Sequence, residues 1–590
     1  MGFARWNARR EGTMQPTTYR SSNSSANEKG ADLILTGGRI YTGDAANPHA
    51  EAVAIRDGRF IAVGSNAAAQ AHGDAGTLTR DLGGAFAMPG LYDMHTHPDL
   101  ALGPRYAGYL DVGIGEPTPE QLRDTILGYA ADHPDEPWVF GQHFVHFTFR
   151  QAGINPDRHW LDRFIPDRPV AIMDRMWGSV LVNSKGLEAA GVTAATPDPG
   201  NGYIVRDDLT GEPTGILVDG AYALVIGAMP PTPHAALVRA YRDGLRHQAS
   251  RGVVATKYVH VCEHRLNALK ALDDAGALMV RVEAAISWQD DIFPVKRRWE
   301  LLAGERHFYR SDRLNANAVK FHFDGTAEPA TSYLLSDWPE QPGWRGKLNL
   351  TPEHIFDMVA DMDRQGIRVI AHCTGDGASD VFLDAVAACR KRAGGQRVRH
   401  QCAHSTLLHP DNVGRFAALD VTAEFSPVGW YYSRFTTGAR SHYGMDRLKG
   451  AYNIRGVLDA GGVAVMGTDW PVSQLNPWVG FETLITRANP WFETDEILGE
   501  GVSLDEAIRI LTLNGAWSMG IEAEAGTIEV GKRADLAVLD RDLTALDPRG
   551  NLHDTRSVLT LVDGQASHDP MSWLAETAHA APWDDPAPEF

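Results

Sequence analysis

Eight short runs rich in valine, isoleucine and alanine recur along the chain, and several are separated by segments with the apolar periodicity of helices. Strands that alternate with helices pair in parallel through right-handed crossovers. The eight units predict an α/β fold, a TIM (β/α)8 barrel that spans residues 87–520. The runs lie at residues 87–95, 252–261, 279–287, 317–325, 367–375, 397–405, 420–427 and 462–471.

The length of 590 residues exceeds the ~250 residues of a typical TIM barrel. We expect a large insertion after the first strand, at about residues 101–245. Residues 31–86 and 521–570 alternate apolar and polar residues around glycine-containing turns, a pattern of short antiparallel strands. We expect these two segments to form one small β-sandwich from both chain ends.

The remaining segments, residues 1–30 and 571–590, are predicted to be a disordered tail and a C-terminal tail. No apolar stretch follows Arg9 and Arg10, so a secretory signal is not indicated. Translation starts at either Met1 or Met14, and the sequence favours neither.

The amino-acid composition limits the possible binding partners of the protein and its possible cellular compartment. A formal net charge of −20 argues against binding to nucleic acids or to anionic membranes, since both depend on clustered lysine and arginine. No stretch approaches the ~20 apolar residues of a membrane helix. The four cysteines show no paired spacing, which favours reduced thiols and a cytoplasmic location.

Ionisable residues stand at or near the ends of several predicted strands, where a TIM barrel has its active site. Each has an alternative explanation, because histidines two apart are often hydrogen-bonded core residues and a lone aspartate often caps a turn. Their coincidence at matching strand ends favours a metal site with nitrogen and oxygen ligands. The set comprises His95, His97, Lys320, His372, His404 and Asp469.

Polar neighbours of this set receive weaker predictions. His322 either binds substrate or is a structural histidine, and Asp324 is expected to shape a turn. We expect His400, which lies deeper in its strand, either to support a metal ligand from behind or to pack in the core. Asp376 is expected either to orient a ligand histidine or to cap the next helix. The sequence makes no comparable case for His260.

Large aromatic residues fall in segments expected to overhang the barrel mouth. Trp177 lies in the predicted insertion, Trp430 follows the seventh run and Trp470 lies at the end of the eighth. Such side chains suit an apolar or aromatic substrate group, and loop packing is the alternative.

The motifs around these residues are similar to those of the amidohydrolase superfamily. The resemblance extends over about residues 31–566 and is to the YtcJ-like amidohydrolase 3 group, which includes N-substituted formamide deformylases. The matching stretches are "PGLYDMHTH", "AVKFHFDG", "AHCTGDGASD", "HQCAHS", "GTDWPV" and "AGTIEVGKRADLAVLD".

By that resemblance, one buried metal ion takes His95, His97 and Asp469, and a second takes His372 and His404. Lys320, carboxylated by CO₂, would bridge them, and two zinc ions suit such mixed ligands. The implied reaction is hydrolysis of a C–N bond in an amide, formamide, carbamate or cyclic amide. A metal-bound hydroxide would attack, with Asp469 as general base and then general acid. The expected partner is a small-molecule substrate, and the resemblance also suggests that the protein forms a homodimer.

Three positions depart from the relatives' usual residues. Gly178 stands where a histidine is expected, Ser426 where glutamine is common and Gly377 where arginine is frequent. None is an implied metal ligand. The departures therefore argue against assigning a relative's substrate to this chain. They do not change the predicted reaction class.

Two other functions compete with the hydrolase. Mononuclear deaminases share the paired histidines and the last aspartate, but they carry a His-x-x-Glu feature at the fifth strand, where this sequence reads "HCTGD". A barrel retained as a binding module is the second alternative. The intact set of candidate ligands argues against it.

Overall fold

The structure is a computed structural model in which most of residues 30–574 are described. The exceptions are residues 101, 103–109, 111–116, 176, 289–303, 328, 340, 392–397, 428–429, 432–441, 492–497 and 548. Nearly all of the two predicted tails lies outside the described residues.

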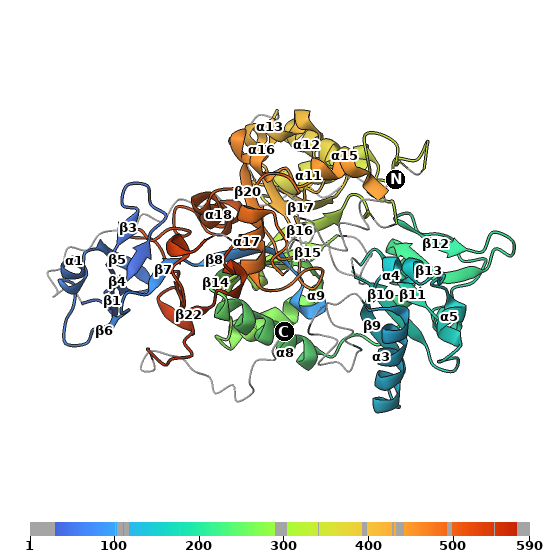
Figure 1. The fold of residues 1–590 in the computed structure, drawn as a ribbon, viewed down its shortest axis with the longest axis horizontal. Coiled ribbons are helices and arrows are strands. Elements are labelled where there is room, and N and C mark those ends of the chain that lie inside the picture. The colour runs from blue at the N-terminus through green and yellow to red at the C-terminus, as the bar shows by residue number, and fades with distance from the viewer. Residues whose placement is uncertain are drawn as a thin grey trace, which may run out of the picture.

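Eight parallel strands form the centre of the molecule in the order in which they occur along the chain (Figure 1). The first and last strands approach each other at the mouth, where the Asp469 N–H donates to the His95 carbonyl at 2.7 Å. The predicted parallel α/β barrel is therefore confirmed as a nearly closed one. Its strands are β8 (Leu91–Thr96), β14 (Val253–Val261), β15 (Arg281–Ser287), β16 (Leu314–His322), β17 (Arg368–Cys373), β18 (Gln401–His404), β19 (Thr422–Phe425) and β20 (Val463–Met466).

Helices cover the outside of the barrel, so its strands are buried on both faces and read as nearly continuous apolar runs. All nine residues of β14 are buried. The Thr351 hydroxyl caps the start of α11 by accepting from the His354 N–H. The covering helices include α8 (His234–Ser250), α9 (Glu263–Asp274), α11 (Pro352–Arg364), α12 (Asp376–Arg390), α13 (Pro410–Leu419), α17 (Pro477–Thr486) and α18 (Leu504–Leu511).

The first predicted strand, 87–95, is in fact two strands. β7 (Phe86–Pro89) pairs with β21 (Leu536–Leu539) in another sheet, and β8 begins only after Gly90. A Cβ atom on Gly90 would lie 2.1 Å from Val254 Cγ1, so the chain passes against β14 at this point. The break between the two strands cannot be seen in the sequence, because both strands are buried and together read as one apolar run.

Both chain ends contribute to two further sheets on one side of the barrel (Figure 1). One has the order β5-β4-β1-β6, and the other has the order β23-β22-β21-β7-β2-β3. They share a core that contains Leu35, Phe60, Val538 and Leu559. Their remaining strands are β1 (Leu33–Thr36), β2 (Arg39–Tyr41), β3 (His49–Ala50), β4 (Ala52–Arg56), β5 (Arg59–Gly64), β6 (Leu78–Asp81), β22 (Ser557–Val562) and β23 (Gln565–His568).

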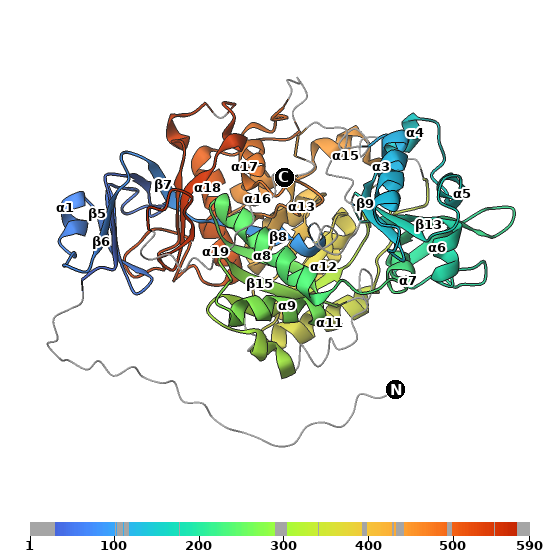
Figure 2. The same cartoon turned by 90° about the horizontal axis from the view of Figure 1, so that it is seen from below.

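Residues between β8 and β14 contain a five-stranded sheet of order β12-β13-β11-β10-β9. In both views it lies on the side of the barrel opposite to the sheets of the chain ends (Figures 1 and 2). Its strands are β9 (Val139–Phe144), β10 (Val170–Asp174), β11 (Ser179–Val182), β12 (Gly202–Arg206) and β13 (Pro213–Asp219).

The close approach at Gly90 makes a testable prediction. Gly90→Ala should lower the free energy of unfolding by about 1–3 kcal/mol, because the added methyl group collides with Val254. Gly64→Ala is the control, since a Cβ atom there meets nothing within 4 Å. In thermal denaturation, Gly90→Ala combined with Val254→Ala should lose less stability than the two single variants together, and strict additivity would contradict the packing described.

Candidate metal centre

The six ionisable residues singled out in the sequence come together at the mouth of the barrel. All six are buried and line one cavity with a volume of ≈ 110 Å³. Three lie within barrel strands, His404 closes β18, and two follow the ends of β8 and β20. They are His95, His97, Lys320, His372, His404 and Asp469.

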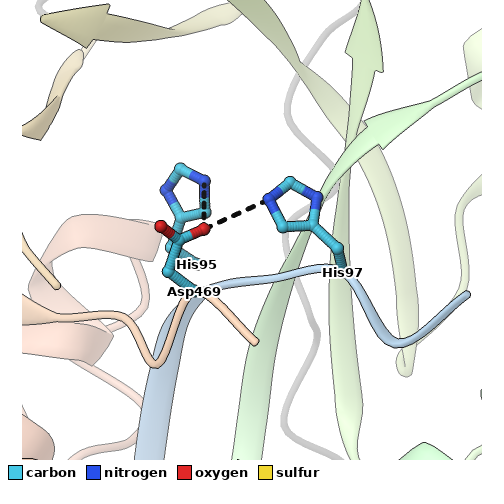
Figure 3. Close-up of side chains that lie close together, drawn as sticks. All are labelled: His95, His97 and Asp469. Atoms are coloured by element: carbon cyan, nitrogen blue, oxygen red, sulfur yellow. Dashed lines mark ion pairs between the residues drawn. The ribbon is translucent and has the colours of Figure 1, made fainter. Parts of the chain in front are cut away.

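His95, His97 and Asp469 form one group of possible metal ligands (Figure 3), and His95, His404 and Glu424 form another. Asp469 Oδ1 lies 3.3 Å from His97 Nε2 and 3.7 Å from His95 Nε2. One ligand atom from each residue lies within 4.8 Å of the others, a spacing that could hold a metal ion. Two imidazole nitrogens and a carboxylate oxygen are a donor set that suits zinc.

His372 and His404 form a second pair beside the first group. Their facing nitrogens, His404 Nε2 and His372 Nδ1, are 3.1 Å apart, and His404 Nδ1 lies 3.5 Å from Asp469 Oδ2. Lys320 is only 1% exposed, and its Nζ lies 3.4 Å from His95 Nε2. Five potential ligands and one lysine therefore share a single buried space.

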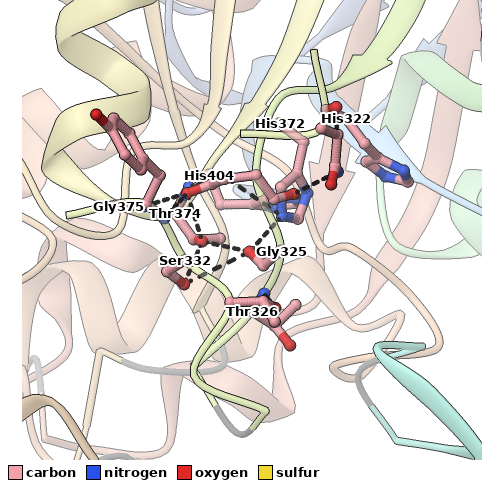
Figure 4. A network of polar contacts seen from close by, with 12 residues as sticks. His322, Gly325, Thr326, Ser332, His372, Thr374, Gly375 and His404 are labelled. Carbon is pink, nitrogen blue, oxygen red and sulfur yellow. Dashed lines mark hydrogen bonds and ion pairs between the residues drawn. The ribbon is translucent and has the colours of Figure 1, made fainter. Parts of the chain in front are cut away.

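Backbone carbonyls hold two of the histidines from behind. The Val259 carbonyl lies 3.3 Å from His97 Nδ1, and the Gly325 carbonyl lies 3.2 Å from His372 Nε2 (Figure 4). A carbonyl can only accept, so each of these nitrogens carries the proton. The other nitrogen of each ring then presents its lone pair to the cavity.

Burial keeps several of these histidines neutral. Loss of hydration holds the pKa of His95 and of His372 well below the usual range, and lowers that of His404 to about 3. Burial alone would raise the pKa of Asp469, but His404 and His97 outweigh it and hold that pKa below its usual value. Neutral imidazoles and an ionised carboxylate are the forms that bind metals.

Asp324 anchors the loops behind His372. Its carboxylate accepts from the backbone N–H groups of Tyr333, Thr374 and Gly375 at 2.7–3.0 Å. Figure 4 shows the Thr374 and Gly375 side of this network. The predicted turn-shaping role thus extends to a clamp between two loops that border the site.

Two buried residues of the site carried no prediction. His260, at the end of β14, places its Nε2 2.9 Å from His322 Nε2. Glu424, in β19, lies 3.1 Å from His95 Nδ1 and is fully buried. Applying the strand-end rule to β14 would have found His260, and a carboxylate in the middle of the apolar run 420–427 was a signal for Glu424.

The three departures from the relatives' residues are each explained by a neighbour. A Cβ atom on Gly178 would lie 2.7 Å from Thr326 Oγ1, and one on Gly377 would lie 2.7 Å from the Tyr333 ring. At Gly377 a larger side chain would also meet the Tyr333 carbonyl oxygen, whereas at Gly178 only the end of the Thr326 side chain lies closer than 3.0 Å. The third departure, Ser426, has its Oγ 2.9 Å from His404 Nδ1.

Of the predicted substrate contacts, the cavity wall includes His322 and Trp177 but not Trp430 or Trp470. The Trp430 ring packs beside the Arg487 guanidinium, 5.9 Å from the ring centre. Trp470 packs in a small apolar cluster with Leu102, Ala240 and Leu475. Both indoles contribute to the packing of the loops, and their contact with a substrate stays a prediction.

The other two polar neighbours lie outside the cavity wall. His400 is buried, with its Nε2 3.1 Å from Asp363 Oδ1, which agrees with a packing role. Asp376 opens α12, and its Oδ1 accepts from the Leu335 N–H at 2.9 Å. Within the described part of the chain, Asp376 has no hydrogen bond to a candidate ligand histidine.

The family model described as "Amidohydrolase family" matches residues 78–568 of the chain. The chain belongs to this family. The putative amidohydrolase YtcJ of Bacillus subtilis is 26% identical, over 91% of this chain and 99% of the relative. An N-substituted formamide deformylase of Arthrobacter pascens is also 26% identical, over 90% of this chain and 97% of the relative.

A solved structure has the same fold. The crystal structure of an uncharacterized metal-dependent hydrolase from Pyrococcus horikoshii superposes with a TM-score of 0.68 at 21% identity, over 88% of this chain and 99% of the other. Among the described residues, every helix is too short or too polar to cross a membrane.

Removal of metal should reveal the centre directly. Treatment with a chelator should lower the thermal unfolding midpoint, and Zn²⁺ should restore it, since an ion at a hundred times its Kd contributes about 2.7 kcal/mol. His97→Ala should abolish most of the metal-dependent shift. His264→Ala should keep it, because His264 bonds the Thr232 carbonyl away from the cavity. Equal shifts in the two variants would contradict this location.

Proposed function

We propose that the chain is a metal-dependent hydrolase that cleaves a C–N bond of a small, apolar or aromatic molecule. The observation that carries the proposal is the convergence of His95, His97 and Asp469 beside the His372–His404 pair in one buried cavity. Membership of the amidohydrolase family supports the reaction class. The formamide deformylase among its relatives makes formamides, then amides, carbamates and cyclic amides, the first substrates to test.

The donor set fits a pair of divalent cations, for which we favour zinc. His95, His97 and Asp469 would hold one ion, and His372 and His404 the other. An ammonium 3.4 Å from His95 Nε2 would repel both ions. Carboxylation of Lys320 by CO₂ replaces that charge with two ligand oxygens. Divalent ions bound there would lower the pKa of water and polarise a substrate carbonyl.

Asp469 is positioned to transfer the proton. Its two carboxylate oxygens face different histidines, His97 at 3.3 Å and His404 at 3.5 Å, so the group lies between the two halves of the site. It would accept a proton from the attacking water and deliver it to the leaving nitrogen. Its lowered pKa provides the ionised form that this role requires.

The outer part of the cavity suits a molecule that is mostly apolar with a few polar groups. Apolar and aromatic side chains, Trp177, Tyr222, Leu448 and Val472 among them, line it. The indole N–H of Trp177 and the hydroxyl of Thr326 have no hydrogen-bond partner within the described part of the chain. Buried polar groups usually have one, so both are available to a substrate.

The deaminase alternative lacks a residue it would need. The position three residues after His372 is Gly375, where a deaminase of this kind has glutamate. A Cβ atom there would lie 1.9 Å from the Tyr333 carbonyl oxygen, so the loop leaves no room for a side chain. This favours hydrolysis of an acyclic or cyclic amide over attack on a heteroaromatic ring.

The role of Asp469 leads to a prediction for turnover. Asp469→Asn should reduce kcat by roughly 100- to 10,000-fold, because the amide cannot accept a proton. Metal content should stay close to that of the wild type, since the histidine ligands remain. The measurement is hydrolysis of an N-substituted formamide panel alongside metal analysis.

The matched control is Asp376→Asn, whose amide oxygen can still accept from the Leu335 N–H. It should keep full activity. Unchanged activity of Asp469→Asn would refute the proton-transfer role. A metal-loaded wild-type protein that cleaves no amide, formamide, carbamate or lactam would refute the proposed function. That result would favour the alternative in which the barrel is a binding module.

A further inference from the structure

We propose that Glu424 and Ser426 form a positioning pair that sets the tautomer and the orientation of one histidine in each cation site. The two residues are two apart in or just after β19, so their side chains point to the same side. Ser426 lines the cavity beside His404, and Glu424 contacts the Nδ1 side of His95. The inference rests on the proposed function in that it assumes cations at both sites.

The contacts form one continuous chain. Glu424 Oε2 lies 3.1 Å from His95 Nδ1, and Ser426 Oγ lies 2.9 Å from His404 Nδ1. The Ser426 hydroxyl in turn donates to Glu424 Oε1 at 3.1 Å. Having donated its only proton, the serine oxygen must accept from His404 Nδ1–H. Both imidazoles therefore direct their Nδ1 protons toward a single carboxylate.

The neighbouring strand leaves space for this arrangement. Gly467 directly follows β20, beside His95 and Glu424. A Cβ atom on Gly467 would lie 2.2 Å from His95 Cβ and 2.8 Å from Glu424 Oε1. Any other residue at this position would displace the histidine or the carboxylate.

The charge of Glu424 points to a cation on the far side of the imidazoles. Its side chain is fully buried, and within the described part of the chain no ion pair joins it to a lysine or an arginine. Glu283, in β15 of the same barrel, has both Lys257 and Arg368. The Lys320 ammonium also acts on Glu424, from beyond ion-pair distance, and carboxylation of Lys320 would remove that charge. Cations held by His95 and His404 would supply the countercharge that a buried carboxylate needs.

The consequence for metal binding follows from the two nitrogens of each ring. With Nδ1–H held by Glu424, His95 presents the lone pair of Nε2 toward Asp469, which lies 3.7 Å away. The Val259 carbonyl holds Nδ1–H of His97, and the Gly325 carbonyl holds Nε2–H of His372. The opposite nitrogen of each ring therefore keeps its lone pair for a cation. Outer partners of this kind typically change metal affinity by 10- to 100-fold when removed.

The experiment measures Zn²⁺ affinity of the full chain by competition with a chromophoric chelator. Glu424→Gln keeps the shape of the side chain and removes its charge, and it should weaken binding by about 10- to 100-fold. Ser426→Ala should weaken it by less, and Ser426→Thr, which keeps the hydroxyl, should restore it. The absorption spectrum of the Co²⁺-loaded protein should shift in Glu424→Gln, because the ligand field of His95 changes.

Asp363→Asn is the matched control. Asp363 bonds His400 at 3.1 Å, the same distance as in the Glu424–His95 pair, but outside the cavity. This variant should leave Zn²⁺ affinity unchanged even if its thermal midpoint falls. Equal loss of affinity in Asp363→Asn and Glu424→Gln would mean that Glu424 acts only through stability, and would overturn the proposal.

The outcomes separate this proposal from the proposed function. Wild-type affinity in both Glu424→Gln and Ser426→Ala overturns the positioning pair and leaves the hydrolase standing. Tight, Glu424-dependent Zn²⁺ binding without hydrolysis of any substrate supports the pair and refutes the hydrolase. Loss of one whole equivalent of zinc in Glu424→Gln would make Glu424 a ligand and overturn the positioning role. If Glu424→Gln does not fold, the Ser426→Ala and Ser426→Thr comparison decides.

Discussion

The burial of ionisable side chains at one end of a parallel barrel is the constraint on which the site depends. His95, Lys320, Glu424 and Asp469 would each be hydrated in isolation, and each is almost completely buried here. Desolvation of this kind is tolerated only where hydrogen bonds and countercharges replace water. Divalent cations would complete such a set, because they neutralise the carboxylates and use the lone pairs of the neutral imidazoles.

The barrel provides this environment through the backbone as much as through side chains. Asp469, directly after β20, adopts a left-handed φ of 53°, and His260, in β14, one of 62°. Non-glycine residues in this region cost of order 1–3 kcal/mol each. Such strain persists where surrounding contacts fix it, and here the Asp469 N–H is tied to the His95 carbonyl. The link that nearly closes the barrel therefore also places the Asp469 carboxylate, for which we propose the proton transfer.

The sequence predicted those parts of the site that follow from strand ends alone. His95, His372 and Asp469 could be located because parallel strands in a barrel must bring their carboxyl ends together. Other features depended on contacts between distant segments. The break at Gly90 reflects Val254, the role of Glu424 reflects a histidine more than three hundred residues earlier, and the packing of Trp430 reflects Arg487. No periodicity in a single run encodes such neighbours.

The departures from the family pattern act in pairs, which bears on how far a relative's substrate can be transferred. Gly178 faces Thr326, and Gly377 faces Tyr333, so the small residue and its larger neighbour fill one volume together. Ser426 likewise belongs with Glu424. In a close-packed structure, a larger residue at Gly178 or at Gly377 would require its neighbour to move. Of these residues, Gly178, Thr326 and Ser426 line the cavity, so its substrate has to be established on this chain rather than inferred position by position.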